Sequence, residues 1–137
     1  LTLLKLMQTN RTREKLNAGQ AALGSFLGLG SPNLAELMSQ VGLDFLVIET
    51  EHNGLDSAEI EHMLMAIKGT DTVPIVRIPS HDAVYIQRAL DMGAMGTFMP
   101  IRCQASILAD LCQYLVVGAA RMLVLFVRMK ICGRGDT

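Results

Sequence analysis

Two carboxylates and an imidazole stand at the end of an apolar run in FLVIETEHNGLD, residues 45–56. Glu49, Glu51 and His52 are followed at once by an Asn-Gly pair, which is typical of a turn. An imidazole titrates near neutral pH, so His52 is suited to proton transfer. The competing interpretation is an exposed or structural histidine. The stretch predicts a polar site at the end of a buried strand, with His52 as candidate base and the two glutamates as supporting acids.

Arg77 is the second unusual residue, because it interrupts the apolar run VPIVRIP at residues 73–79. A buried guanidinium is costly without an anionic partner. One interpretation is a salt bridge to Glu49 or Glu51. The other is a bidentate contact with the carboxylate or enolate of a substrate, which the planar guanidinium suits.

Three other polar residues are weaker candidates for a functional role. Asp91 stands late in a predicted helix, either as a surface acid or as a partner that orients His52. His62 lies among glutamates in a predicted helix and is interpreted as solvated, and His81 begins the next helix and is interpreted as structural.

The elements that must position these residues alternate along the chain. Apolar runs predict strands at residues 21–30, 44–49, 73–79 and 96–101, and amphipathic patterns predict helices at 31–42, 56–69 and 81–93. Ser31 and Asp56 are predicted N-caps, the first followed by Pro32 and the second by Glu59 in a capping box. In the last helix, Val84, Ile86, Ala89 and Leu90 are predicted to face inward.

Apolar strands separated by helices indicate an α/β protein with a parallel sheet covered on both faces. Either an open doubly wound sheet or part of a (β/α)8 TIM barrel fits this order. The glycine-rich stretch GLGSPN lacks the last glycine of a dinucleotide-binding loop. Polar residues collect where successive strands end, which favours the barrel. A whole barrel takes about 250 residues, so a chain of 137 residues is predicted to supply its first half, about four βα units.

Charge and cysteine content indicate which classes of partner and which cellular setting are expected. The net charge of −1 without a basic cluster argues against a nucleic-acid partner. Cys103, Cys112 and Cys132 form no CxxC pair and leave an odd thiol, which favours a reduced, cytoplasmic setting. The N-terminal apolar stretch is too short to span a membrane, and residues 114–131 are interrupted by two arginines. No membrane partner is therefore expected.

Three segments in order, GSPNLAELMSQVGLDFLVIETEHNGLD, PIVRIP and IQRALDMGAMGTFMP, resemble the HpcH/HpaI aldolase/citrate lyase family over about residues 13–101. Its members are class II aldolases that handle pyruvate, such as 4-hydroxy-2-oxoheptanedioate and 2-keto-3-deoxy sugar acid aldolases. The resemblance implies a (β/α)8 barrel and cleavage of a small 4-hydroxy-2-oxo acid to pyruvate and an aldehyde. It also implies a divalent metal (Mg, Mn or Co) and a homo-oligomer in full-length relatives.

The resemblance assigns roles to three residues. His52 matches the catalytic base, and Arg77 matches the arginine that contacts pyruvate and stabilises its enolate. Asp91 matches the acid that pairs with the catalytic histidine, in some members from a neighbouring subunit. Glu49 stands where many members have an aspartate, which puts its supporting role in question. The family's metal ligands are expected beyond residue 137, so no metal ligand is assigned in this chain.

Residues 102–137 depart from the family pattern, and a frameshift or a misassembled gene is one hypothesis for them. A divergent pair of amphipathic helices is the alternative. We expect a single partial barrel domain over residues 1–137 that is inactive alone. A non-catalytic α/β module that binds a carboxylate or a partner chain, and a pseudogene product, remain the other interpretations.

Overall fold

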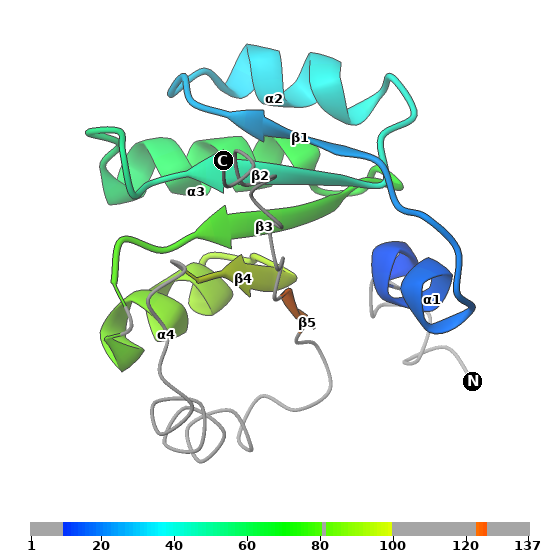
Figure 1. The fold of residues 1–137 in the computed structure, drawn as a ribbon. Helices are drawn as coiled ribbons and strands as arrows, with labels where there is room; N and C mark the ends of the chain where they lie inside the picture. Colours follow the sequence, from blue (N-terminus) through cyan, green and yellow to red (C-terminus); the bar gives the residue numbers. More distant parts are fainter. Residues whose placement is uncertain (1–9, 81, 100–122, 126–137) are drawn as a thin grey trace, which may run out of the picture.

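A computed structural model describes residues 10–80, 82–99 and 123–125, and Figure 1 shows their arrangement. The elements in chain order are α1 (Arg11–Asn17), β1 (Gly24–Leu27), α2 (Pro32–Ser39), β2 (Phe45–Glu49), α3 (Ser57–Ile67), β3 (Val73–Arg77), α4 (Ala83–Asp91), β4 (Gly96–Phe98) and β5 (Leu123–Leu125). Each predicted strand and helix is present with shorter bounds.

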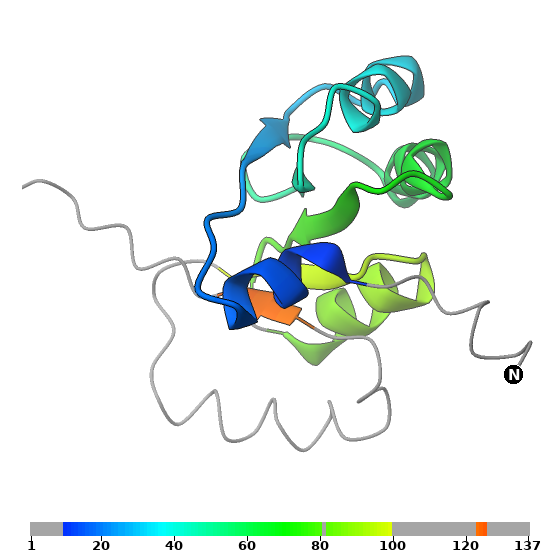
Figure 2. The same ribbon diagram turned by 90° about the vertical axis from the view of Figure 1, so that its right-hand side faces the viewer.

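The strands form one parallel sheet in the order β1-β2-β3-β4-β5, so chain neighbours are also neighbours in the sheet. The helices α2, α3 and α4 lie along the outer side of this sheet (Figure 2). This is the βα repeat of a barrel, which confirms the predicted first half of a (β/α)8 fold. Helices were expected on both faces, but in the described residues α2, α3 and α4 cover only one, and the other face is the concave inner one.

Two apolar clusters lie on the two faces of the sheet, because side chains alternate along each strand. Leu46 and Ile48 of β2 point to the helices and pack in a cluster with Met63 and Ile67 of α3. The inner cluster consists of Val47, Val73, Ile75, Met95 and Phe98, with Phe45 packed against it. Glu49 and Arg77 continue the inner rows by two residues beyond Val47 and Ile75, so both point to the concave face.

The two predicted N-caps, Ser31 and Asp56, are confirmed. The Ser31 hydroxyl accepts a hydrogen bond from the Leu34 amide at 3.3 Å, and Pro32 is the first residue of α2. Asp56 accepts from the Glu59 amide at 2.8 Å, and the Glu59 carboxylate accepts from the Asp56 amide at 2.9 Å. This reciprocal pair is the expected capping box at the start of α3.

The inward assignment of Val84 was wrong, since Val84 is 49% exposed. Ile86 and Ala89 are buried and Leu90 packs partly against the core, as expected. Val84 precedes Ile86 by two positions, which is about 200° around a helix of 3.6 residues per turn. It therefore faces away from the sheet.

The helix α1, which the sequence pattern did not predict, is fastened to the start of β2. The Thr12 hydroxyl donates to the Asp44 carbonyl at 2.8 Å, and Lys15 donates to the Asp44 carboxylate. The same carboxylate accepts the Leu23 amide at 2.8 Å. Two hydrogen bonds lower the pKa of Asp44 below its usual range. The bond from Lys15 has the larger effect, and the bond from the Leu23 amide has the smaller one.

Several sequence-based expectations fall outside the described residues. His81, residues 100–101 of the last predicted strand and the three cysteines are among them, as is most of the apolar range 114–131. Within that range Leu123–Leu125 forms β5, parallel to β4, where only helices had been considered. In the part of the chain that the structure describes, no helix has the length and apolar character needed to cross a membrane.

Candidate functional site

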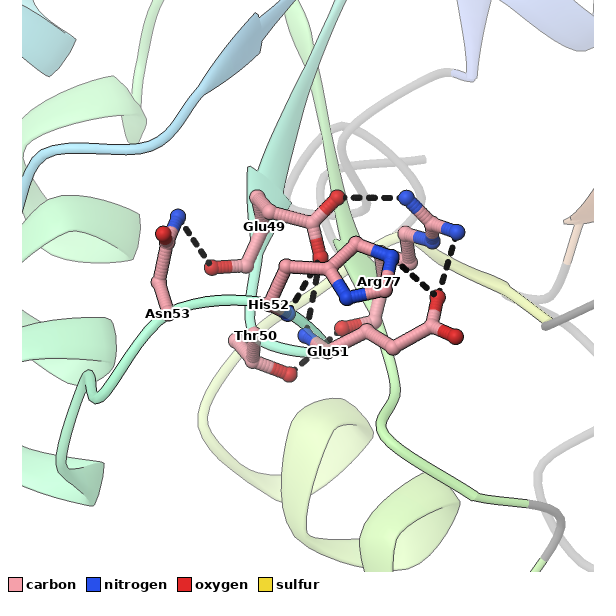
Figure 3. Close-up of polar contacts among 6 residues, drawn as sticks. All are labelled: Glu49, Thr50, Glu51, His52, Asn53 and Arg77. Atoms are coloured by element: carbon pink, nitrogen blue, oxygen red, sulfur yellow. Dashed lines mark hydrogen bonds and ion pairs between the residues drawn. The ribbon is translucent and has the colours of Figure 1, made fainter.

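Glu49 and Arg77 meet because they are register partners at the ends of neighbouring strands. Glu49 is the last residue of β2, and Arg77 is the last residue of β3. Their side chains therefore leave the sheet side by side, at the carboxyl edge and on the inner face, as Figure 3 shows. This is the edge where α/β barrels place their chemistry.

The guanidinium of Arg77 lies between two carboxylates. Nη1 is 2.7 Å from Oε2 of Glu49, and Nη2 contacts Oε2 of Glu51. The Arg77 side chain is 18% exposed, and its guanidinium carbon lies 5.6 Å from the centre of the Phe98 ring. The predicted ion pair is thus present, with both glutamates rather than with one of them.

Glu49 also organises the turn that carries the histidine. Its Oε1 accepts the backbone N–H of Glu51 at 2.8 Å and that of His52 at 3.3 Å. On the other side of the turn, the Thr50 amide donates to the Arg77 carbonyl at 3.2 Å. A single buried carboxylate, 8% exposed as a residue, therefore binds both the turn and the arginine. The extra methylene of glutamate over aspartate does not prevent either contact.

His52 lies beside this cluster and is open to solvent. Its side chain is 67% exposed, and Nε2 is 3.7 Å from Oε2 of Glu51. That distance is too long for a hydrogen bond but short enough for charge attraction when the imidazole is protonated. The same Glu51 oxygen thus faces both His52 and Arg77 (Figure 3).

Asp91 is not brought to His52 within this chain. It is exposed at the end of α4, immediately before the turn that leads into β4. The end of a helix that connects two parallel strands lies at the amino edge of the sheet, whereas His52 follows the carboxyl end of β2. The surface-acid interpretation fits the single chain, and a role across a subunit interface stays a prediction.

Phe98 and Phe26 were not singled out from the sequence. Phe98 ends β4 beside Arg77, and its ring meets Phe26 of β1 edge-on, with centroids 5.9 Å apart and planes at 77°. The available signal was positional, because Phe98 ends its strand as Arg77 and Glu49 end theirs. The two rings give the charged cluster an apolar side on the inner face.

Among the described residues, no group of three or more His, Cys, Asp or Glu side chains is placed to hold a metal ion. The Glu49 carboxylate already accepts hydrogen bonds from two backbone amides and from Arg77, and the Glu51 carboxylate contacts the same arginine. The carboxylates of this cluster therefore do not fit a metal site. That the metal ligands come from another part of the polypeptide stays a prediction.

Known proteins resemble this chain in both sequence and fold. The sequence model of the HpcH/HpaI aldolase/citrate lyase family matches residues 22–118, a range that includes the first part of the atypical tail. The 5-keto-4-deoxy-D-glucarate aldolase of Salmonella paratyphi A is 35% identical over 91 residues, which are 66% of this chain and 36% of the aldolase. This chain thus spans about a third of the length of that relative.

Solved structures of the same family have a similar fold. An HpcH/HpaI aldolase/citrate lyase family protein from Burkholderia cenocepacia J2315 superposes with a TM-score of 0.68 at 32% identity, over 75% of this chain and 41% of that one. The citrate synthase SbnG superposes with a TM-score of 0.64 at 25% identity, over 82% and 53% of the two chains. The residues matched by the family sequence model, 22–118, include β1 to β4 and the whole Glu49–Arg77 cluster. This chain belongs to the HpcH/HpaI aldolase/citrate lyase family.

Proposed function

We propose that the Arg77 cluster is the pyruvate-binding part of an aldolase site that cleaves a 4-hydroxy-2-oxo acid to pyruvate and an aldehyde. The observation that carries the proposal is the register pair of Glu49 and Arg77 at the carboxyl edge of the sheet, beside the turn that bears His52. Family membership supports an aldolase-like lyase. The 2-oxo acid class is our extension to this chain.

In this proposal Arg77 and His52 divide the chemistry. The guanidinium of Arg77 binds the substrate carboxylate and stabilises the enolate oxygen that forms when the carbon–carbon bond breaks. His52 takes the proton from the 4-hydroxyl group, so that the aldehyde carbonyl forms as the bonding electrons pass into the enolate. Protonation of the enolate carbon then gives pyruvate. Glu51 lies beside this imidazole, with its Oε2 3.7 Å from Nε2.

A divalent cation (Mg, Mn or Co) would add electrophilic stabilisation of the enolate in the complete site. Because the described residues offer it no ligand set, we propose that its ligands lie elsewhere in the polypeptide and that the 137-residue chain does not turn over alone. We further propose a cytoplasmic homo-oligomer in which Asp91 of one subunit approaches His52 of another.

A non-catalytic module that binds a carboxylate is the second candidate. It is favoured by an arginine already placed on the concave face, within a largely covered cluster. It shares the Arg77 site with the aldolase proposal and differs in having no proton transfer at His52.

A chimera tests the aldolase proposal. Residues 22–99 of this chain replace the matching segment of the Salmonella aldolase, and pyruvate release from 5-keto-4-deoxy-D-glucarate is measured with added Mn²⁺. We expect metal-dependent release that falls by about 100-fold or more in His52→Ala, in the range of general base catalysis. His62→Ala, an exposed histidine of α3, is the matched control and retains activity.

The outcomes separate the two candidates. A chimera that folds, as judged by its thermal unfolding, and releases pyruvate equally well with His52→Ala contradicts the proposed base. A folded chimera that binds pyruvate through Arg77 but releases none supports the binding module.

A further inference from the structure

We infer that Glu51 occupies the position of a substrate carboxylate on Arg77, and that an incoming anion must displace it. This inference deepens the proposed function and rests on its carboxylate site at Arg77. The exchange would make Glu51 an internal competitor that sets how tightly the site holds a 2-oxo acid.

The charges of the cluster call for such an exchange. One guanidinium faces two carboxylates, those of Glu49 and Glu51, so the three groups together carry a net charge of −1 when ionised. A substrate carboxylate that joined them would meet two like charges around a single cation. At about 4 Å, and with an effective dielectric constant near 20, each such pair repels by roughly 4 kcal/mol. Tight binding therefore requires one glutamate to leave.

Glu49 is the glutamate that stays. Its carboxylate makes three hydrogen bonds, one with the Arg77 guanidinium and two with the backbone amides of the following turn. Only 8% of the residue is exposed. Its departure would leave these two amides without their acceptor and Arg77 without its hydrogen-bonded carboxylate.

Glu51 is the glutamate that leaves. Its Oε2 contacts Arg77 but makes no hydrogen bond of acceptable geometry in the described part of the chain, and the same holds for Nε of Arg77. The contact is thus one of charge rather than of hydrogen-bond geometry. Glu51 stands on the turn after β2, with its side chain 20% exposed. Swinging away, it stays near His52, whose imidazole lies 3.7 Å from it.

A planar carboxylate fits the vacated position. It would accept from Nη2, which Glu51 now contacts, and from Nε, which has no partner among the described residues. These two donors lie on one edge of the guanidinium and match the bidentate geometry of a carboxylate. The opposite donor, Nη1, stays on Glu49. An α-keto carboxylate such as pyruvate is therefore the ligand class that replaces Glu51.

The test measures pyruvate binding to the full 137-residue chain without metal, by isothermal titration calorimetry. The variants are Glu51→Gln, which removes the charge at nearly constant shape, and Glu51→Ala, which removes the carboxylate group. Glu61→Gln, at an exposed position of α3, is the matched control. We expect pyruvate to bind about tenfold more tightly to both Glu51 variants, a change of about 1.4 kcal/mol, and the control to bind as the unaltered chain does.

A ligand-free readout checks the contact itself. The NMR signal of the Arg77 Nε–H group, assigned through its loss in Arg77→Lys, is expected to shift in both Glu51 variants and not in Glu61→Gln. Thermal unfolding of each variant shows that it is folded. An unchanged Arg77 signal, or Glu51 variants that bind pyruvate no more tightly than the unaltered chain, would overturn the inference.

The same titration separates this inference from the proposed function. Binding that disappears in Arg77→Lys but does not tighten in the Glu51 variants contradicts the exchange and leaves the carboxylate site standing. Binding that is indifferent to Arg77→Lys, or no binding in any variant, contradicts both.

Discussion

Arg77 and Arg11 make ion pairs of nearly equal length in different surroundings. The Arg77–Glu49 distance is 2.7 Å, with side chains 18% and 11% exposed. The Arg11–Asp71 distance is 2.6 Å, with side chains 57% and 75% exposed. If burial rather than distance sets the strength, the first pair should contribute clearly more to stability.

The magnitude follows from the contacts. A hydrogen bond to a charged group that is largely covered contributes about 1.5–3 kcal/mol, so we expect a coupling free energy of about 2 kcal/mol between Glu49 and Arg77. An exposed pair contributes about 0.2–1 kcal/mol because solvent screens it. We expect Arg11 and Asp71 to couple by less than about 0.5 kcal/mol.

Two double-mutant cycles, read by urea unfolding under far-ultraviolet circular dichroism, measure both couplings. The site cycle uses Glu49→Gln and Arg77→Gln, and the control cycle uses Arg11→Gln and Asp71→Asn. The Glu49→Gln amide keeps an oxygen for the turn amides that Oε1 now accepts, so the site cycle isolates the ion pair. Equal couplings in the two cycles would refute the argument from burial.

Three further changes test how the scaffold holds the site. Asp44→Asn should lower the free energy of unfolding by about 1 kcal/mol at neutral pH. Since the folded-state pKa of Asp44 is depressed, this difference should persist above pH 4 and vanish as the pH falls through the folded pKa, in urea titrations at several pH values. Asp56→Ala should cost about 1 kcal/mol in the same titrations by removing the α3 cap, and no loss would contradict the capping box. Gly24→Ala should cost about 1–3 kcal/mol, because its Cβ would lie 2.3 Å from the Phe45 ring, and an unchanged midpoint would contradict that packing.

The fold could be predicted where local sequence and tertiary packing agree. Strand β2 is apolar on both faces because one face meets helices and the other meets the barrel interior, and its sequence reports both. The start of α3 is encoded within four residues by its capping box. By contrast, α1 is short and polar apart from Leu16, so its position depends on contacts with Asp44 that no local pattern reports.

The candidate site was predicted in composition but not in pairing. That Arg77 needs an anion follows from its apolar neighbours, whereas its use of both Glu49 and Glu51 depends on the register between β2 and β3. The Phe98 contact needs the register of a third strand. The register between strands is fixed by the pairing of their backbone hydrogen bonds, and a single sequence does not show which residues pair.

Pyruvate binding to Arg77→Lys tests the central claim most directly, because lysine keeps the positive charge and loses the planar fork. Arg88→Lys, at an exposed position of α4, is the matched control. In a titration of the metal-free chain we expect saturable binding that weakens by about tenfold or more in Arg77→Lys and stays unchanged in Arg88→Lys. Equal binding by the two variants would contradict a carboxylate site at Arg77.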